Sequence, residues 1–470
     1  MRRIIPCLVI VLWAATGFAQ VWEKLVQPGL TYRMEVDSRV PRIMHALRWS
    51  QGAPELEARS ELAGPAIFDS SADRGRETLT AMARRVEAVA AVNGDFFPFT
   101  GDPLGAMVRR RELLSRPWPG RPVFAWGPQS SAVATLSWRG SIESDPPSLK
   151  IDLDGFNEET PNDGLTLFTE ASGLALAKPA SVYVVLKLGE GAWTPTVHRT
   201  AEVLSMTADV EALAIPPGGA ILAARGRKVA ELAKFVPGTK LKVMYETSGL
   251  DWSQSEHVLA GGPTLVSRGQ VRVDWQAGGF RDTFALRRHP RTAIGRTREG
   301  DIWVVAVDGR QPMSEGATLD ELAGIMLRLG CTDAINLDGG GSTGLSLQGA
   351  LMNRPSEGSE RKISNGWVLV RTQAPVVPVQ AEAAPVFQGP KALTLGQNRT
   401  YAVLGPDGAR ITNLEILWSA QGSIWVDQDG VVRPFREGPG RLVAVVRGQR
   451  IELDVIVEPT PKPPVSRRSP

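Results

Sequence analysis

The sequence predicts an α+β protein, with a mixed central sheet and flanking helices, that is followed by a small all-β module. Two stretches, residues 79–95 and 318–338, place apolar residues three and four apart and then give a short apolar run that ends at an Asp. This spacing indicates a helix, a turn and a buried strand in each stretch. Residues 386–458 instead show short alternating apolar runs that are broken by turn residues, which is typical of a β-sandwich.

The individual elements follow from local signals. Thr318 and Glu321 form a capping box for the second helix, and Gly330 suits the residue after its C-terminus. Residues 302–307 are nearly continuously apolar, as expected of a strand that is covered on both faces, and residues 291–295 form a shorter strand before it. Alternating helices and strands of this kind favour a sheet with helices packed against it.

Composition narrows the class of partner. The chain has 470 residues, of which 43% are hydrophobic and 22% charged, and its formal net charge is +3. This is the balance of an ordinary globular protein without a strongly basic face, so we expect no nucleic-acid partner. Outside residues 1–19 the single cysteine is Cys331, in an apolar context that indicates a small buried residue.

The N-terminus resembles a secretory signal peptide over residues 1–19. Arg2 and Arg3 precede an apolar run at residues 4–13, and residues 17–19 have the small-x-small pattern of a cleavage site. A membrane anchor is the alternative, but the run is shorter than the ~20 apolar residues that a helical span needs. We therefore expect a secreted, periplasmic or cell-surface protein with no transmembrane segment after signal cleavage.

The remaining chain divides by composition. Residues 20–371 form the large domain, with its core at about 85–370, and residues 372–385 are a linker rich in Pro and Ala. Residues 386–458 resemble bacterial immunoglobulin-like modules and would suit a contact with the cell envelope. Residues 459–470 are expected to be a disordered tail.

The sharpest local motif is Asp338, Gly339, Gly340, Gly341 and Ser342, directly after an apolar strand. Three glycines allow close approach of a ligand, and their N–H groups can form a nest for a phosphate or sulfate. The alternative is a tight turn without a ligand. No Lys follows the glycines, so the motif is not a nucleotide-binding P-loop.

A second motif is Asp95 beside Phe96 and Phe97. A carboxylate that is desolvated by aromatic neighbours has a raised pKa and suits acid or base catalysis, although a simple turn with two core phenylalanines is the alternative. Basic residues near these motifs could hold phosphate oxygens or could be ordinary surface charges. They are His289, Arg291, Arg310, Arg361 and Lys362.

Metal and nucleophile motifs are scarce. The four histidines are scattered, and the sequence has no cysteine cluster and no Gly-x-Ser-x-Gly elbow. Asp95, Asp308 and Asp338 together would suit Ca²⁺ or Mg²⁺, which prefer oxygen ligands. The sequence therefore predicts no firm cofactor, with either of these two ions as the candidate.

Several short blocks in fixed order resemble the phosphodiester glycosidase family. They cover residues 93–97, 260–265, 291–295, 308–310, 318–323, 336–342 and 361–366. The resemblance implies hydrolysis of a sugar from a sugar-1-phosphodiester. The animal members contain disulfides and epidermal-growth-factor-like segments, and this sequence shows neither. A bacterial envelope or extracellular glycan is therefore the expected substrate.

The resemblance and the residue chemistry together give a site hypothesis. The catalytic residues are Asp338 and Asp95, with supporting hydrogen bonds from Asn93 and Asp308. The phosphate contacts are Gly339, Gly340, Gly341, Ser342, Arg291 and Arg361, with Asn365 in support. Two alternatives remain: a non-catalytic binder of anionic surface glycans, and a metal-dependent phosphodiesterase that cleaves the P–O bond.

Overall fold

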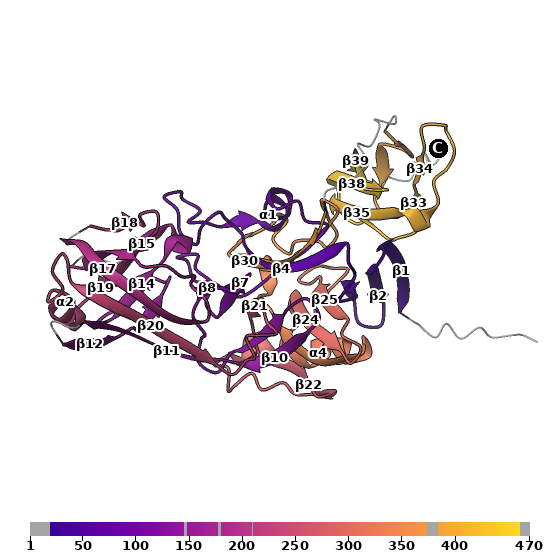
Figure 1. Cartoon of the computed structure of the whole chain (residues 1–470). Coiled ribbons are helices and arrows are strands. Elements are labelled where there is room, and N and C mark those ends of the chain that lie inside the picture. Colours follow the sequence, from indigo (N-terminus) through magenta and orange to yellow (C-terminus); the bar gives the residue numbers. More distant parts are fainter. Residues whose placement is uncertain (1–18, 145–147, 177–179, 209, 374–383, 461–470) are drawn as a thin grey trace, which may run out of the picture.

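The structure is a computed structural model that describes residues 19–144, 148–176, 180–208, 210–373 and 384–460. It consists of a central body, a lobe of strands on one side and a C-terminal group of strands on the other (Figure 1). Strands dominate, and the four α-helices of the described residues have only four to ten residues each. The expected signal peptide (1–19), linker (372–385) and tail (459–470) lie mainly outside the described residues.

The central body is built on two sheets that pack face to face. The large core sheet has the order β1-β2-β3-β25-β24-β26-β22-β23, and the small core sheet has the order β28-β27-β6-β30-β4. Ile294 and Val304 of the large sheet share one apolar cluster with Val92 and Trp367 of the small sheet. All of the pairings within these two sheets are antiparallel.

The strands of the large core sheet are β1 (Gln20–Gln27), β2 (Leu30–Asp37), β3 (Arg42–Trp49), β22 (Thr264–Ser267), β23 (Gln270–Val271), β24 (Arg291–Thr297), β25 (Ile302–Val307) and β26 (Cys331–Asn336). Those of the small core sheet are β4 (Leu56–Leu62), β6 (Ala90–Asn93), β27 (Leu345–Leu347), β28 (Ala350–Leu351) and β30 (Asn365–Arg371). Strand β5 (Glu77–Thr78) follows β4 in the chain, and β29 (Lys362–Ile363) precedes β30. These two strands pair in a separate two-stranded sheet.

One short helix covers each outer face of this sandwich. Helix α4 (Leu319–Arg328) buries Leu322 and Met326 against the large sheet, and its N-terminus has the expected capping box of Thr318 and Glu321. Helix α1 (Leu79–Arg85) packs in the same way on the small sheet. Both helices and the strands after them therefore lie where the apolar periodicity placed them.

A third sheet joins the body to the lobe. It has the order β10-β9-β21-β7-β8, from β7 (Met107–Arg109), β8 (Glu112–Ser115), β9 (Pro122–Trp126), β10 (Ser131–Thr135) and β21 (His257–Ala260). Phe124 and Trp126 face the core of the central body, whereas Val123 and Ala125 face the core of the lobe. The two-residue period of a strand thus buries both faces of this sheet.

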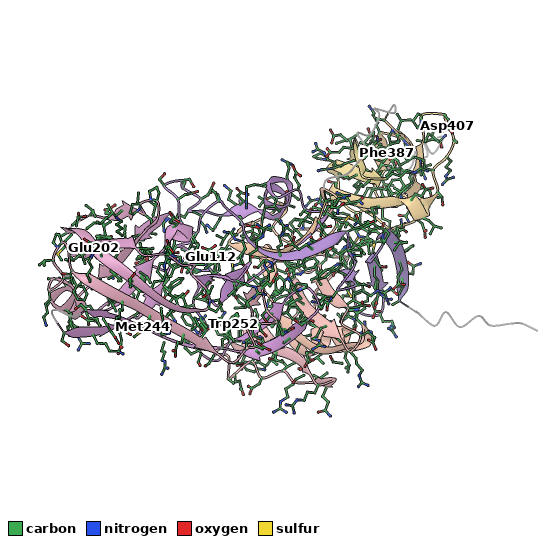
Figure 2. The ribbon with its side chains drawn as sticks, in the orientation of Figure 1. Glu112, Glu202, Met244, Trp252, Phe387 and Asp407 are labelled. Atoms are coloured by element: carbon green, nitrogen blue, oxygen red, sulfur yellow. The ribbon has the colours of Figure 1, made fainter. Side chains whose placement is uncertain are left out.

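The lobe is a second eight-stranded sheet with the order β12-β11-β20-β17-β16-β19-β14-β13. Glu202 and Met244 mark its position in Figure 2. Its strands are β11 (Ser137–Ser144), β12 (Leu149–Asp152), β13 (Gly155–Phe156), β14 (Leu165–Phe168), β16 (Val182–Leu188), β17 (Thr196–Ala208), β19 (Gly219–Ala224) and β20 (Lys240–Ser248). Helix α2 (Arg227–Leu232) and the pair β15 (Leu174–Leu176) and β18 (Ala212–Ala214) complete it.

The C-terminal group contains strands and one 3₁₀ turn, η3 (Asn413–Glu415). Its strands are β31 (Val386–Gln388), β32 (Ala392–Thr394), β33 (Arg399–Thr400), β34 (Ala402–Leu404), β35 (Ile416–Gly422), β36 (Ile424–Val426), β37 (Val431–Pro434), β38 (Gly438–Val446) and β39 (Gln449–Glu458). Lys24 Nζ of β1 donates to the carbonyl oxygens of Ile416 (2.5 Å) and Gln428 (2.8 Å), which fastens this group to the body. Its assignment as an immunoglobulin-like module stays a prediction.

The α+β prediction is wrong, because the structure is a β-rich fold with four short helices among its described residues. Most of the difference arises between residues 107 and 271, where the sequence analysis identifies no elements and the structure has strands with alternating exposed and buried residues. Strand β17, for example, exposes His198 and buries Val197 and Ala201. No described helix is both long and apolar enough to cross a membrane.

Candidate active site

A cleft of about 520 Å³ opens where the turns after β6 and β26 meet the start of β24. Aromatic side chains and guanidinium groups dominate its wall. The lining residues are Phe96, Leu104, Arg121, Gly279, Phe280, Arg281, Thr283, Phe284, His289, Arg291, Arg310, Asp338, Gly339, Gly340, Gly341 and Arg361. Short helix α3 (Asp282–Ala285) supplies part of one side.

The turns that carry Asp95 and Asp338 are joined directly. Asp338 N–H donates to the carbonyl oxygen of Gly94 at 2.9 Å, and Asn93 Nδ2 donates to the Asp338 carbonyl oxygen at 2.7 Å. Asn365 Oδ1 accepts the Asp95 N–H at 2.8 Å. Asn93 and Asn365 therefore hold both turns in place, and neither is among the described residues that line the cleft.

Both carboxyl groups have strongly perturbed pKa values. Burial raises the pKa of Asp95 to about 6, while the nearby Arg121 charge opposes that rise. Burial also raises the pKa of Asp338 to about 6, and the Asp95 charge adds to the rise. Two interacting carboxyls with pKa values near neutrality are suited to acid, base or nucleophile roles, and they titrate as a pair.

The glycine turn uses most of its backbone N–H groups for hydrogen bonds within the protein. The N–H of Gly339 donates to Asp338 Oδ1 at 2.9 Å, that of Gly340 to Pro290 O at 2.9 Å and that of Ser342 to Gly339 O at 3.2 Å. Three of the four N–H groups expected to hold phosphate are thus engaged within the protein. The Gly341 N–H remains as the candidate external donor of this turn.

Glycine is required in the turn for steric reasons. Gly340 has a φ of +63°, which favours glycine, and a Cβ on Gly339 would lie 2.8 Å from the Pro290 carbonyl oxygen. The Ser342 hydroxyl is buried beside the Asp338 carboxyl and lowers its pKa, although its geometry falls outside that of a regular hydrogen bond. The motif therefore positions the Asp338 carboxylate at the base of the cleft.

Arg291 is a fully buried cation whose charge has no carboxylate partner among the described residues. Its Nε donates to Ala317 O at 2.9 Å, and Nη2 donates to the carbonyl oxygens of Phe284 and Arg287. Nη1 is buried without a partner, and burial lowers the pKa of the guanidinium to about 10. Buried polar atoms are normally hydrogen-bonded, so this unpaired guanidinium nitrogen is a candidate donor to an anion.

Arg121 is a residue of the cleft that the sequence analysis missed. Its guanidinium carbon lies 4.9 Å from the ring centroid of Phe96 and 5.0 Å from that of Phe280, and its Nε and Nη1 are buried without partners. Asp95 and Asp338 are the charges that raise its pKa against the effect of burial. A lone Arg after Pro119 and Gly120 has no periodic signal, so only the folded chain reveals it.

The other predicted basic residues divide into two groups. Arg361 and Arg310 line the cleft, but Arg361 is already paired with the carboxylate of Glu357. Arg310 Nη2 lies 3.4 Å from Nδ1 of His289, which also lines the cleft. Lys362 instead pairs with Asp73 at 2.5 Å and is not among the lining residues.

Asp308 lies apart from the other two aspartates, in a buried polar network. Its Oδ1 accepts hydrogen bonds from Arg354 N at 2.9 Å and Asn353 Nδ2 at 3.4 Å, and its Oδ2 is 3.7 Å from His45 Nε2. It is not among the described residues that line the cleft. The expected grouping of Asp95, Asp308 and Asp338 is not present, and the described residues contain no cluster of three or more His, Cys, Asp or Glu side chains with metal-binding geometry.

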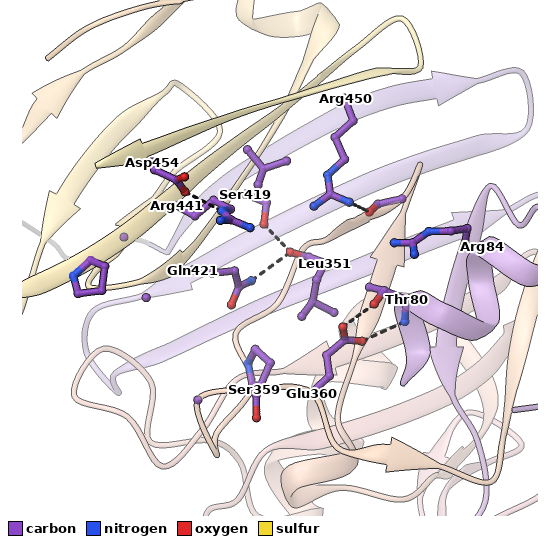
Figure 3. A pocket seen from close by; sticks show the side chains of 17 residues that line it. Thr80, Arg84, Leu351, Ser359, Glu360, Ser419, Gln421, Arg441, Arg450 and Asp454 are labelled. Atoms are coloured by element: carbon purple, nitrogen blue, oxygen red, sulfur yellow. Dashed lines mark hydrogen bonds and ion pairs between the residues drawn. The ribbon is translucent and has the colours of Figure 1, made fainter. Parts of the chain in front are cut away.

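A second cleft of about 430 Å³ lies between the central body and the C-terminal strands (Figure 3). Its polar groups largely satisfy one another: Arg441 Nε donates to Asp454 at 2.8 Å, Arg450 Nη1 to Gly349 O at 2.7 Å, and Thr80 Oγ1 to Glu360 at 2.5 Å. None of the described residues that line this cleft has a buried side-chain nitrogen or oxygen without a partner, whereas Arg121 and Arg291 of the first cleft do.

Comparisons with known proteins place much of this cleft in one family. Residues 197–370 match the family model described as phosphodiester glycosidase. The N-acetylglucosamine-1-phosphodiester alpha-N-acetylglucosaminidase of Bos taurus is 39% identical over 132 residues, which are 28% of this chain and 23% of the bovine protein. The SPbeta prophage-derived uncharacterized protein YomE of Bacillus subtilis is 40% identical over 76 residues, 16% of this chain and 12% of YomE.

The fold has relatives of known structure. The crystal structure of a hypothetical protein from Synechocystis matches with a TM-score of 0.63 and 25% identity, over 74% of this chain and 63% of that chain. The chain matches less than a quarter of the length of each of the two curated relatives above. Arg291, Asp338 and Arg361 lie inside the segment that matches the family model, whereas Asp95 and Arg121 precede it.

Proposed function

Because the chain belongs to the phosphodiester glycosidase family through residues 197–370, we propose that it is a hydrolase that releases a sugar from a sugar-1-phosphodiester. The observation that carries the proposal is a cleft lined by the Asp338 carboxyl and by Arg121 and Arg291, which have unpaired buried nitrogens, with the Asp95 carboxyl close behind its wall. The finer proposal, that the substrate is a bacterial envelope or extracellular glycan, rests on the sequence resemblance alone.

The chemistry of the bond fits these groups. Cleavage breaks the bond between the anomeric carbon and the phosphate oxygen, and the oxygen of water ends on the sugar. The departing phosphate is a good leaving group, so it needs cationic donors more than a strong general acid. Arg291 and Arg121 supply unpaired N–H groups for the phosphoryl oxygens.

A carboxylate must act at the sugar. Asp338 lines the cleft and is the candidate nucleophile, or base toward water, whereas Asp95 lies behind the wall with one unpartnered oxygen, Oδ1. Asp95 also raises the pKa of Asp338 through its charge. We therefore assign the reacting position to Asp338 and the modulation of its protonation state to Asp95.

The test is an assay of the purified chain on sugar-1-phosphodiesters, with Asp338→Asn as the matched variant. The Asn side chain retains an oxygen for the Gly339 N–H, so we expect a correctly folded variant whose turnover is reduced about 10³-fold. Phosphate binding should persist in the variant. Binding without turnover in the wild type would favour the glycan-binder alternative, and loss of turnover on chelation would favour the metal-dependent phosphodiesterase.

A further inference from the structure

The side chain of Arg354, which belongs to the central body, is held by the C-terminal group of strands. Its Nη1 donates to the carbonyl oxygen of Ile424 at 3.0 Å, and its Nη2 donates to that of Gly422. The guanidinium carbon also lies 4.4 Å from the ring centroid of Phe435. Because charge-assisted hydrogen bonds are directional, these contacts fix the guanidinium against the C-terminal group.

The main chain of Arg354 contacts the turn that carries Arg310 into the cleft. The Arg354 N–H donates to Asp308 Oδ1 at 2.9 Å, and the Arg354 carbonyl oxygen accepts from Gln311 Nε2 at 2.9 Å. Asp308 and Gln311 lie on either side of Arg310, which lines the cleft and has a φ of +58°. Few residues with a side chain adopt this conformation, so the turn depends on the support of its neighbours.

Asn353 makes a similar link to the glycine turn. Its Nδ2 donates to the carbonyl oxygen of Thr343 at 3.1 Å, and its Oδ1 accepts the Leu345 N–H at 2.7 Å. Thr343 directly follows the 3₁₀ turn η2 (Gly340–Ser342), so Asn353 holds the end of the glycine turn. From the C-terminal group, Gln421 Nε2 donates to the Asn353 carbonyl oxygen at 3.2 Å.

The two turns meet at Gly340. A Cβ on Gly340 would lie 3.2 Å from Arg310 Nη2 and 3.5 Å from Nη1, so the Arg310 guanidinium lies against this glycine. Arg310 is exposed, and no carboxylate among the described residues forms an ion pair with it. Its guanidinium can therefore donate to an anion in the cleft, and its position depends on both turns.

We propose that the C-terminal group is a positioning element of the cleft. Through Arg354 and Asn353 it holds the Arg310 guanidinium over the glycine turn, where Arg310 contributes to the binding of the substrate phosphate. This inference rests on the proposed function and extends the site to residues outside the cleft. Arg354 and Asn353 are not among the described residues that line the cleft, so they act through Arg310.

Hydrogen-exchange mass spectrometry of the full chain tests the structural link without a substrate. Arg354→Met removes the donors to the C-terminal group and retains the apolar stem and the main-chain bonds to the Arg310 turn. Peptides that cover residues 308–316 and 338–345 should exchange at least about threefold faster in this variant, because local opening becomes easier. Wild-type exchange in both peptides would overturn the proposal.

Arg450→Gln is the matched control. Arg450 lies in the same interface between the central body and the C-terminal group (Figure 3), and its Nη1 donates to the Gly349 carbonyl oxygen at 2.7 Å. This bond reaches neither of the two turns, so the variant should leave exchange in both peptides unchanged. If Arg450→Gln accelerated exchange as much as Arg354→Met, any weakening of the interface would have the same effect, and the specific role of Arg354 would be excluded.

Kinetics on a sugar-1-phosphodiester test the consequence for the cleft. Arg354→Met should raise KM several-fold, roughly the effect of one charged contact, with kcat within about twofold of wild type. Arg354→Lys retains the charge and should recover part of this loss. Arg310→Gln should raise KM to a similar extent, and adding Arg354→Met to it should raise KM no further, because both act through one guanidinium. Additive effects in the double variant would contradict the proposal.

The two tests separate this inference from the proposed function. Faster exchange in both peptides with an unchanged KM would overturn the positioning role and leave the glycosidase intact. If wild type hydrolyses no sugar-1-phosphodiester, the proposed function fails, and with it the role of Arg310 toward the substrate. The exchange comparison would then still decide whether the C-terminal group holds the two turns.

Discussion

The Asp338 N–H donates to the Gly94 carbonyl oxygen at 2.9 Å, so the turn after β26 is joined directly to the turn after β6. This bond crosses from the large core sheet to the small one, at the point where both sheets end. It brings together Asp95 and Asp338, whose charges interact. The first two predictions below depend on this junction.

The pH dependence of activity follows from the two carboxyls. Both pKa values are raised from 3.8 to about 6, so both groups are ionised above that pH and protonated below it. Because an ionised carboxylate is required at the sugar, kcat/KM should fall as the pH is lowered through about 6. A rate profile between about pH 4.5 and 8 measures this. A flat profile across that range would show that neither carboxyl limits the reaction.

Asp95→Asn should stabilise the protein at neutral pH while it impairs activity. The native state binds the Asp95 proton more tightly than the unfolded chain, so the stability of the wild type decreases as the pH rises from 3.8 to about 6 and stays low above that. A neutral amide avoids this loss, which is on the order of 2–3 kcal/mol for a group this deeply buried.

Urea unfolding at pH 7 and at pH 4 measures the effect. The stability gain of Asp95→Asn should be present at pH 7 and absent at pH 4. A variant that is less stable than wild type at pH 7 would mean that attraction between the Asp95 carboxylate and Arg121 outweighs desolvation.

Glu357→Gln should improve substrate binding. Glu357 pairs with Arg361, which lines the cleft, and therefore competes with any anionic ligand for that guanidinium. Removal of the carboxylate should lower KM several-fold, roughly the effect of one charged contact, with kcat unchanged. Arg361→Gln is the opposing variant and should raise KM. The idea fails if Glu357→Gln raises KM as much as Arg361→Gln does.

Asp308→Asn should affect stability more than catalysis. The Asp308 carboxylate accepts hydrogen bonds from Arg354 N and Asn353 Nδ2 and faces His45, away from the residues that line the cleft. Loss of its charge from this buried network should cost about 1–3 kcal/mol in unfolding free energy. We expect kcat to stay within about threefold of wild type. A decrease in kcat as large as that of Asp338→Asn would instead show that Asp308 takes part in catalysis.

Sequence reasoning succeeded where the signal is local. The apolar run of β25 and the capping box of α4 define their own elements, and both are confirmed. The blocks around Asp95 and Asp338 also identify turns that the structure brings together, next to the start of β24 at Arg291. In each case a short stretch of chain contains the information that fixes its conformation.

Sequence reasoning failed where the position of a residue depends on packing between distant segments of the chain. Arg121 becomes a cleft residue only because it packs on Phe96 and Phe280, which no local pattern indicates. Asp308 follows a strand as Asp338 does, yet its carboxylate is directed into the protein by the later residues Asn353 and Arg354. The fold class was wrong because the sequence analysis identified no elements in the lobe, whose eight-stranded sheet pairs segments that lie far apart in the chain.

The position of bond cleavage tests the central claim most directly. Hydrolysis of a sugar-1-phosphodiester in ¹⁸O-water, followed by mass spectrometry of both products, shows which atom water attacks. Our account, with Asp338 directed at the sugar and the arginines at the phosphate, predicts the label in the sugar hydroxyl. Label in the phosphate would contradict it, because that product requires attack at phosphorus.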